Sequence, residues 1–226
     1  MSLSPRVFEF LLALSENNHR DWFNAHKDWY QEAHTSVIEL ADALLEEMNK
    51  HDHLETETGK KSLFRIYRDV RFRKDKRPYK EHWAGGFRRA TAKLRGGYYF
   101  HLAPGNSFIA GGFWGPNKED LLRIRQEIAA DAEELREIIA APEFVATFGG
   151  LQGDQLKTAP KGFSREHPDV DLLRYKQFIV QHDFSDADVH TEEFPEMAST
   201  AFQAMRPWLN YMSEVLTTDA NGVSLI

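Results

Sequence analysis

Apolar residues recur at three- and four-residue spacing over the first fifty positions, and this spacing predicts helices. Ser4-Pro5 is a typical helix start, and the first helix is expected to end at Asn17-Asn18. A second helical pattern extends over residues 22–48, with a break predicted within residues 26–28. The N-terminal part of the chain is therefore predicted to be helical, with an apolar face that packs on a core.

From Ser62 the spacing changes to two, and the residues become β-branched, aromatic and punctuated by glycine. Strands are predicted at residues 63–70, 83–89, 97–102 and 107–113. The last two flank Ala103-Pro104-Gly105-Asn106, a turn sequence that favours an antiparallel hairpin. The four strands are expected to form one meander.

Helical spacing returns from Asn117 to Pro142, and a stripe that begins near Glu192 predicts a C-terminal helix kinked at Pro207. A short helix near residues 169–174 and a strand near 177–183 are predicted between them. The order helix, strands, helix, strand, helix lacks the regular alternation of a doubly wound fold. The sequence predicts an α+β fold, a mainly antiparallel sheet of four to six strands with helices from both chain ends packed on it, in a single domain over residues 1–226.

The composition supports a folded core without covalent staples. The 226 residues are 42% hydrophobic and 12% aromatic, and there is no cysteine, so disulfides, thiolate ligands and a catalytic thiol are excluded. No stretch approaches the roughly 20 apolar residues of a membrane span. The short apolar run Val7–Leu14 is interrupted by Glu9, which argues against a signal peptide. We expect a cytoplasmic protein with no membrane partner.

The charge is distributed unevenly along the chain. The formal net charge is -7, but 14 of the 28 Lys and Arg residues lie between Lys60 and Arg95, together with three acids. This segment therefore carries +11 and the rest of the chain -18. Because position matters more than the sum, the basic segment is the first place to look for a site.

A period of two across residues 63–70 assigns side chains to the two faces of the predicted first strand. Arg65, Tyr67 and Arg71 would lie on one side. Phe64 and Ile66 would lie on the other. One face of the sheet would thus carry guanidinium groups and a phenol.

Tyr99 and His101 share one side of the predicted hairpin, and a polar pocket forms if that side is the one that carries Arg65. Arginine forks match phosphate or carboxylate, and a histidine can exchange protons near neutral pH. We expect a small anionic ligand, phosphorylated or carboxylated, as the partner. The predicted ligand-binding residues are Arg65, Tyr67, Arg71, Lys76, Tyr79, Lys80, Tyr99 and His101.

The common catalytic signatures are missing from the sequence. There is no phosphate-binding loop, dinucleotide fingerprint, nucleophile elbow or H-E-x-x-H motif. His51-Asp52-His53 is the one close histidine pair, and its place at the end of a predicted helix favours a cap over a metal site. No metal, cofactor or catalytic residue is predicted, and the sequence leaves open whether the protein is an enzyme.

Two alternatives to the small-anion prediction remain open. The basic loop 73–80 could bind nucleic acid, with Tyr79 and Trp83 stacking on bases. This alternative ranks lower because the remaining -18 repels a polyanion and no helix-turn-helix or RNA-binding signature is present. The protein could instead be a non-catalytic interaction module whose basic segment docks the acids of one predicted helix. Those acids are Glu127, Asp131, Glu133, Glu134 and Glu137.

Several segments together resemble a known family. They are Phe64-Arg65-Ile66-Tyr67-Arg68-Asp69-Val70-Arg71-Phe72, Lys74-Asp75-Lys76, Pro78-Tyr79-Lys80, Gly97-Tyr98-Tyr99-Phe100-His101-Leu102, Ser107-Phe108-Ile109-Ala110-Gly111-Gly112, Pro160-Lys161-Gly162-Phe163 and His167-Pro168. The chain thereby resembles the domain-of-unknown-function family 2461, an uncharacterised and largely bacterial group. The resemblance covers nearly the whole chain and implies one domain, and it transfers no activity, cofactor or catalytic residue.

Overall fold

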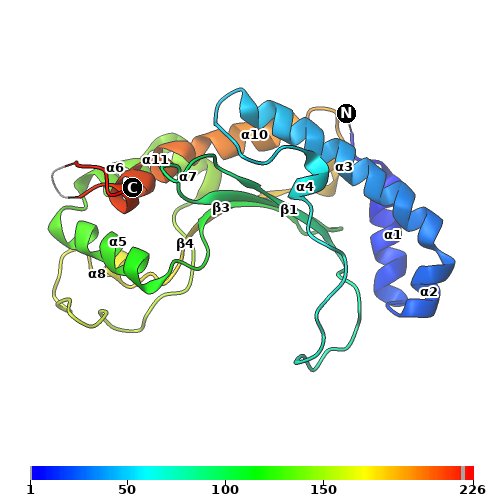
Figure 1. Ribbon diagram of the computed structural model, residues 1–226, viewed down its shortest axis with the longest axis horizontal. Coiled ribbons are helices and arrows are strands. Elements are labelled where there is room, and N and C mark those ends of the chain that lie inside the picture. The colour runs from blue at the N-terminus through cyan, green and yellow to red at the C-terminus, as the bar shows by residue number, and fades with distance from the viewer. Residues whose placement is uncertain (1, 220–221) are drawn as a thin grey trace. The chain divides into compact units, whose positions relative to one another are not determined.

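The computed structural model describes residues 2–219 and 222–226 (Figure 1). Within that part of the chain, four strands form one antiparallel sheet in the order β1-β2-β3-β4, so the predicted α+β class is confirmed. The strands are β1 Trp83–Arg88, β2 Gly97–Leu102, β3 Ser107–Phe113 and β4 Phe178–Phe184. The helices are α1 Pro5–Glu16, α2 Arg20–Ala25, α3 Lys27–Asn49, α4 Gly59–Ser62, α5 Lys118–Ala130, α6 Glu133–Ala140, α7 Pro142–Phe148, α8 Val170–Leu173, α9 Asp186–Val189, α10 Phe194–Ala204 and α11 Arg206–Thr217.

The chain divides into two compact units that are interleaved along the sequence. The first unit comprises Met1–Phe87, Tyr99–Ile109 and Asp183–Thr200. The second comprises Arg88–Tyr98, Ala110–His182 and Ala201–Ile226. All four strands contribute residues to both units. The single domain expected from the sequence stays a prediction.

An aromatic core holds the N-terminal helices of the first unit together. Phe10 of α1 is fully buried, and its ring lies 6.0 Å from Trp22, 5.7 Å from Trp29 and 6.0 Å from Tyr30. The predicted break between the second and third helices is confirmed at His26, the residue that separates α2 from α3. The turn lets aromatic residues from three helices meet around one ring.

Trp83 attaches helix α3 to the sheet. Its ring is buried and stacks on Tyr30 and His34 of α3, at centroid distances of 5.5 and 5.4 Å. On the same strand, Phe87 packs 5.5 Å from Phe100 of β2. Alternate residues of a strand point to opposite faces, so α3 covers the face that carries these rings (Figure 1). The neighbouring residues of β2 therefore belong to the opposite face.

The second unit has its own core around α11. Trp208 is fully buried, and its ring meets Phe113 of β3 at 6.2 Å and Phe144 of α7 at 6.4 Å. Asn117 caps α5 by accepting the amide of Asp120, as the sequence predicts. Among the described residues, no helix has the length and apolar character needed to cross a membrane.

Two predicted helices are each interrupted. The pattern from Asn117 to Pro142 forms α5 and α6, because Asp131 takes an extended conformation and its carboxylate accepts the amide of Glu133. The C-terminal pattern forms α10 and α11, which separate at Met205 in place of a kink at Pro207. Proline occupies the first turn of α11, where no amide partner is needed.

The predicted strand at residues 63–70 is wrong. Residues 63–82 form an irregular two-stranded extension, here called the arm. An isolated bridge joins Tyr67 to Tyr79 across the arm, and another joins Leu63 to Gly85 of β1. The Ile66 carbonyl accepts from Lys80, but Pro78 has no amide to donate, so the ladder cannot continue toward the loop. Residues 63–70 therefore pair with the opposite side of the arm near Tyr67 and do not form a regular strand.

Gly59 provides the first test of the fold. A Cβ at this position would lie 2.4 Å from the Asp42 amide nitrogen and 2.7 Å from the Ile38 carbonyl oxygen, both in the backbone of α3. We expect Gly59→Ala to lower the free energy of unfolding by about 1–3 kcal/mol because α4 must move away from α3. Gly115→Ala, where a Cβ meets nothing within 4 Å, should change it by less than about 0.5 kcal/mol. Urea denaturation of both variants measures the difference, and equal effects would contradict the close packing.

Candidate functional site

Tyr99 and His101 lie on the face of β2 opposite helix α3. Their neighbours Phe100 and Leu102 are fully buried on the α3 side, so the strand alternation directs the two polar side chains away from it. The hairpin turn at residues 103–106 is confirmed, and its register brings Phe108 of β3 beside His101. This part of the site follows directly from the predicted hairpin.

The two side chains form a compact polar group with a second histidine. The Tyr99 hydroxyl lies 3.0 Å from His101 Nδ1, within hydrogen-bond distance. The ring of His82 lies 4.2 Å from the ring of His101, and Phe108 stacks on its neighbour His101 at 4.7 Å. His101 is only 9% exposed. His101 thus contacts both a second imidazole and a phenol.

Lys80 and Phe64 extend this group along the arm. The Lys80 ammonium lies 5.7 Å from the centre of the Phe64 ring, and that ring lies 6.2 Å from Tyr99. All these residues belong to the first unit. We call the set the histidine–tyrosine cluster; its members are Phe64, Lys80, His82, Tyr99, His101 and Phe108.

Burial sets the protonation states in the cluster. Burial and, to a smaller extent, the neighbouring His82 together lower the pKa of His101 to about 4. Burial also lowers the pKa of His82, with Lys80 adding to the effect and Glu81 opposing it. The pKa of Tyr99 is raised by burial, and that of Lys80 is lowered by the same cause. Near neutral pH both imidazoles are therefore neutral.

A neutral imidazole next to a phenol can accept or relay a proton. In the tautomer with its proton on Nε2, His101 accepts the Tyr99 hydroxyl at Nδ1 and offers an N–H donor on its other side. Lys80 supplies positive charge close enough to lower the pKa of His82. The arrangement has the elements needed to hold an anion and to move a proton to or from it.

The structure brings together three of the eight predicted ligand-binding residues, Lys80, Tyr99 and His101. Tyr67 and Tyr79 lie elsewhere on the arm, with their rings 5.4 Å apart. Both pack near Phe23 of α2, which stacks on Tyr79 at 4.0 Å. Through these ring contacts the two tyrosines attach the arm to α2.

Arg65, Arg71 and Lys76 do not converge on Tyr99 and His101 in this arrangement. Arg71 pairs with Asp69 at 2.7 Å. Lys76 donates to the Val70 carbonyl at 3.0 Å, and Arg65 is exposed and makes no hydrogen bond or ion pair with the residues that the structure describes. The predicted docking of the basic segment onto the acidic residues within positions 127–137 stays a prediction.

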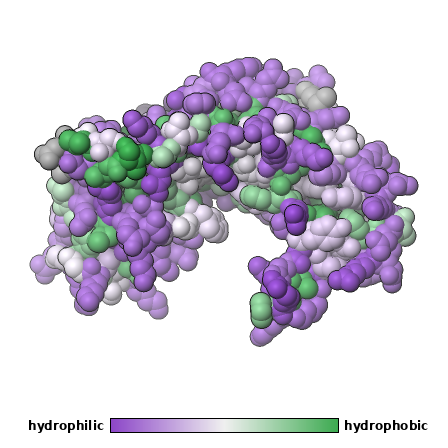
Figure 2. Space-filling view, in the orientation of Figure 1, coloured by the Kyte–Doolittle hydropathy of each residue, from purple (hydrophilic) through white to green (hydrophobic). Residues whose placement is uncertain are grey.

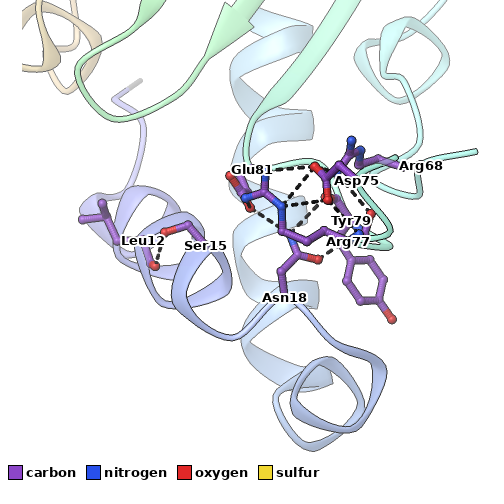
Figure 3. A network of polar contacts seen from close by, with 8 residues as sticks. All are labelled: Leu12, Ser15, Asn18, Arg68, Asp75, Arg77, Tyr79 and Glu81. Atoms are coloured by element: carbon purple, nitrogen blue, oxygen red, sulfur yellow. Dashed lines mark hydrogen bonds and ion pairs between the residues drawn. The ribbon is translucent and has the colours of Figure 1, made fainter. Parts of the chain in front are cut away.

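Local carboxylates hold the loop of the arm. Asp75 accepts from both Arg68 and Arg77, and Arg77 also pairs with Glu81 at 2.5 Å (Figure 3). These hydrogen bonds keep the pKa of Asp75 well below its usual range. At the base of the loop, the Asn18 side chain exchanges two hydrogen bonds with the Tyr79 backbone, each 3.1 Å long (Figure 3).

Two details of the sequence interpretation are wrong. Tyr79 and Trp83 are 3% and 2% exposed, so their rings are not accessible for stacking on bases. Phe64 was expected to share a face with Ile66, yet Ile66 is buried while Phe64 is half exposed beside Tyr99. Strict alternation requires a continuous strand, and the arm is not one.

His82, Phe64 and Phe108 were missed as site residues. Phe108 could have been found, because the turn at residues 103–106 sets 101 opposite 108. His82 could also have been found, because it directly precedes Trp83 of β1 and alternate residues of a strand point to opposite faces. His82 should therefore lie on the face opposite Trp83. Phe64 had no comparable signal, since its position depends on the irregular backbone of the arm.

The fold and the cluster define an α+β protein in which the buried His101 and the partly buried His82 lie in contact on the sheet face opposite α3. The chain belongs to the family described as conserved hypothetical protein (DUF2461), whose model matches residues 6–211. Comparison with curated proteins and with solved structures gave no match. Among the described residues, no group of three or more histidine and carboxylate side chains is placed to hold a metal ion.

The low pKa of His101 makes stability depend on pH. In the unfolded chain His101 has its ordinary pKa of 6.5, whereas in the folded chain its pKa is about 4. Stability contributed by the neutral ring is therefore complete above about pH 6.5 and is lost as the pH falls toward 4. His101→Gln should remove this contribution, so the slope of unfolding free energy against pH should decrease by up to about 1.4 kcal/mol per pH unit. Urea titrations at pH 7.5, 6.0 and 5.0 compare the two proteins, and parallel curves would contradict the assignment.

Proposed function

We propose that the histidine–tyrosine cluster binds a small anionic ligand, phosphorylated or carboxylated, and exchanges a proton with it. The observation that carries the proposal is the contact of His82 with His101, 4.2 Å between ring centres, beside the Tyr99 hydroxyl. Such a pair holds two neutral bases where only one can readily become charged. Perturbed titratable groups of this kind are typical of functional sites.

The charge of the cluster favours an anion over a cation or a neutral ligand. Lys80 already contributes positive charge, and the two imidazoles add more when they are protonated. A bound anion stabilises the imidazolium form, because an opposite charge close by raises the pKa of a histidine. Binding should therefore be accompanied by proton uptake. The aromatic rings of Phe64 and Phe108 border the cluster and provide apolar contact for the rest of a ligand.

Sulfate is the probe for the linked proton, because it remains a dianion throughout the pH range used. We expect sulfate to raise the Tm of the wild-type protein more at pH 5.5 than at pH 7.5, relative to sodium chloride at equal ionic strength. Lys80→Gln should reduce the sulfate effect at both pH values. His101→Gln should remove most of the difference between the two pH values, because it cannot take up the proton.

The matched control is Lys157→Gln, which removes an exposed lysine from the second unit. It should respond to sulfate as the wild type does. Nucleoside monophosphates, sugar phosphates and tricarboxylates are then screened by the same measurement to find the natural ligand class. A sulfate effect equal to that of chloride, or one that Lys80→Gln and His101→Gln both leave unchanged, would reject the proposal.

A further inference from the structure

We propose that the end of the arm is a second binding surface, independent of the histidine–tyrosine cluster, and that its ligand is single-stranded nucleic acid. The ring of Phe72 is 95% exposed at this end. The Arg73 amide donates to the Val70 carbonyl at 3.3 Å, which closes a tight turn with Arg71 and Phe72 at its centre. The turn thus presents an aromatic ring at the tip of the arm.

The cations around Phe72 are of two kinds. Arg71 is held by Asp69, and its guanidinium lies 5.8 Å from the centre of the Phe72 ring. Arg73 and Lys74 are exposed, and neither forms an ion pair with the residues that the structure describes. Free cations next to an exposed ring match a ligand that alternates phosphates and flat bases.

The acids of the arm form ion pairs with Arg68, Arg71 and Arg77 and leave Arg73 and Lys74 outside those ion pairs. Asp75 is engaged by Arg68 and Arg77, and Asp69 by Arg71. Residues 63–82 contain eight Lys and Arg residues and three acids, a local charge of +5. The surface of the arm is accordingly mostly hydrophilic, with few hydrophobic residues among the polar ones (Figure 2). Because these pairs order the loop before binding, the tip loses little conformational freedom when it meets a ligand.

One exposed ring favours a single strand over the other anionic partners. A stacking contact uses one ring for each unpaired base, and every base offers a flat face. An anionic membrane would instead require a broad apolar surface beside the cations, and Phe72 is flanked by charged residues on both sides. A duplex keeps its bases stacked inside, so Phe72 would have no partner there.

Fluorescence anisotropy with a labelled twelve-nucleotide oligo-dT tests the proposal in full-length protein at 50 mM salt. Binding is expected with a Kd of roughly 10⁻⁶ to 10⁻⁴ M, the range of non-specific binding. Raising the salt to 200 mM should weaken it about tenfold, as expected when two or three phosphates are contacted. Phe72→Ala should weaken it about 5- to 100-fold, and Phe72→Tyr should restore it, because stacking needs the ring.

Matched variants separate the tip from general effects. Trp114→Ala removes another exposed aromatic residue, 71% exposed and outside the arm, and should leave binding unchanged. The double variant Arg73→Gln/Lys74→Gln should weaken binding and flatten its salt dependence, whereas Lys118→Gln/Lys157→Gln should do neither. Since all these side chains are exposed, the variants should fold normally, as circular dichroism can verify.

Three results would overturn the proposal. The first is no binding at 50 mM salt with 500 µM protein. The second is binding that Phe72→Ala and Arg73→Gln/Lys74→Gln leave intact. The third is binding to phosphatidylserine vesicles or to a duplex of the same length that exceeds binding to the single strand and is lost in Phe72→Ala. Failure here leaves the sulfate experiment untouched, because that experiment concerns Lys80 and His101.

Discussion

The attachment of the arm to the N-terminal helices is the constraint on which both proposed surfaces depend. Asn18 satisfies the amide and the carbonyl of Tyr79 at once, and Phe23 stacks on the ring of the same residue. The Asn18 side-chain amide thus makes the two backbone hydrogen bonds that a neighbouring strand would make in a sheet. With Tyr79 fixed, Lys80 and His82 are directed to the sheet, and the loop that ends in Phe72 is carried away from it.

The second constraint is the division of the sheet into two faces. Trp83 is stacked against α3, so one face is occupied by aromatic packing and the other is left to His101 and Tyr99. Burial of a polar group costs free energy unless it finds a partner. The Tyr99 hydroxyl meets that need for His101, and the ring stays neutral because charging it would require a counter-ion. The low pKa is thus a consequence of the same packing that places the cluster.

Sequence reasoning succeeded where local rules are sufficient. The hairpin of β2 and β3 was predicted at its observed bounds because alternation and a strong turn agree. It failed for residues 63–70, where β-branched and aromatic residues suggest a strand but Pro78 interrupts the opposing ladder. The site was predicted only in part for the same reason. Tyr99 and His101 follow from regular geometry, whereas the contact of Phe64 with Tyr99 depends on an irregular backbone held by Asn18, far away in the sequence.

The two proposed surfaces differ in whether their charged groups are buried or exposed, and this difference separates the ligands proposed for them. In the cluster, burial suppresses charge on the histidines, and the anion proposed as its ligand would supply the negative charge that stabilises their protonated form. At the tip of the arm, cations such as Arg73 are exposed to water, so their charged form has no desolvation penalty. They can attract anions at long range. The small size of the ligand proposed for the cluster is consistent with the burial of His101. The exposed tip offers one aromatic ring and a few cations. A single strand matches both, because it repeats a flat base and a phosphate at every nucleotide.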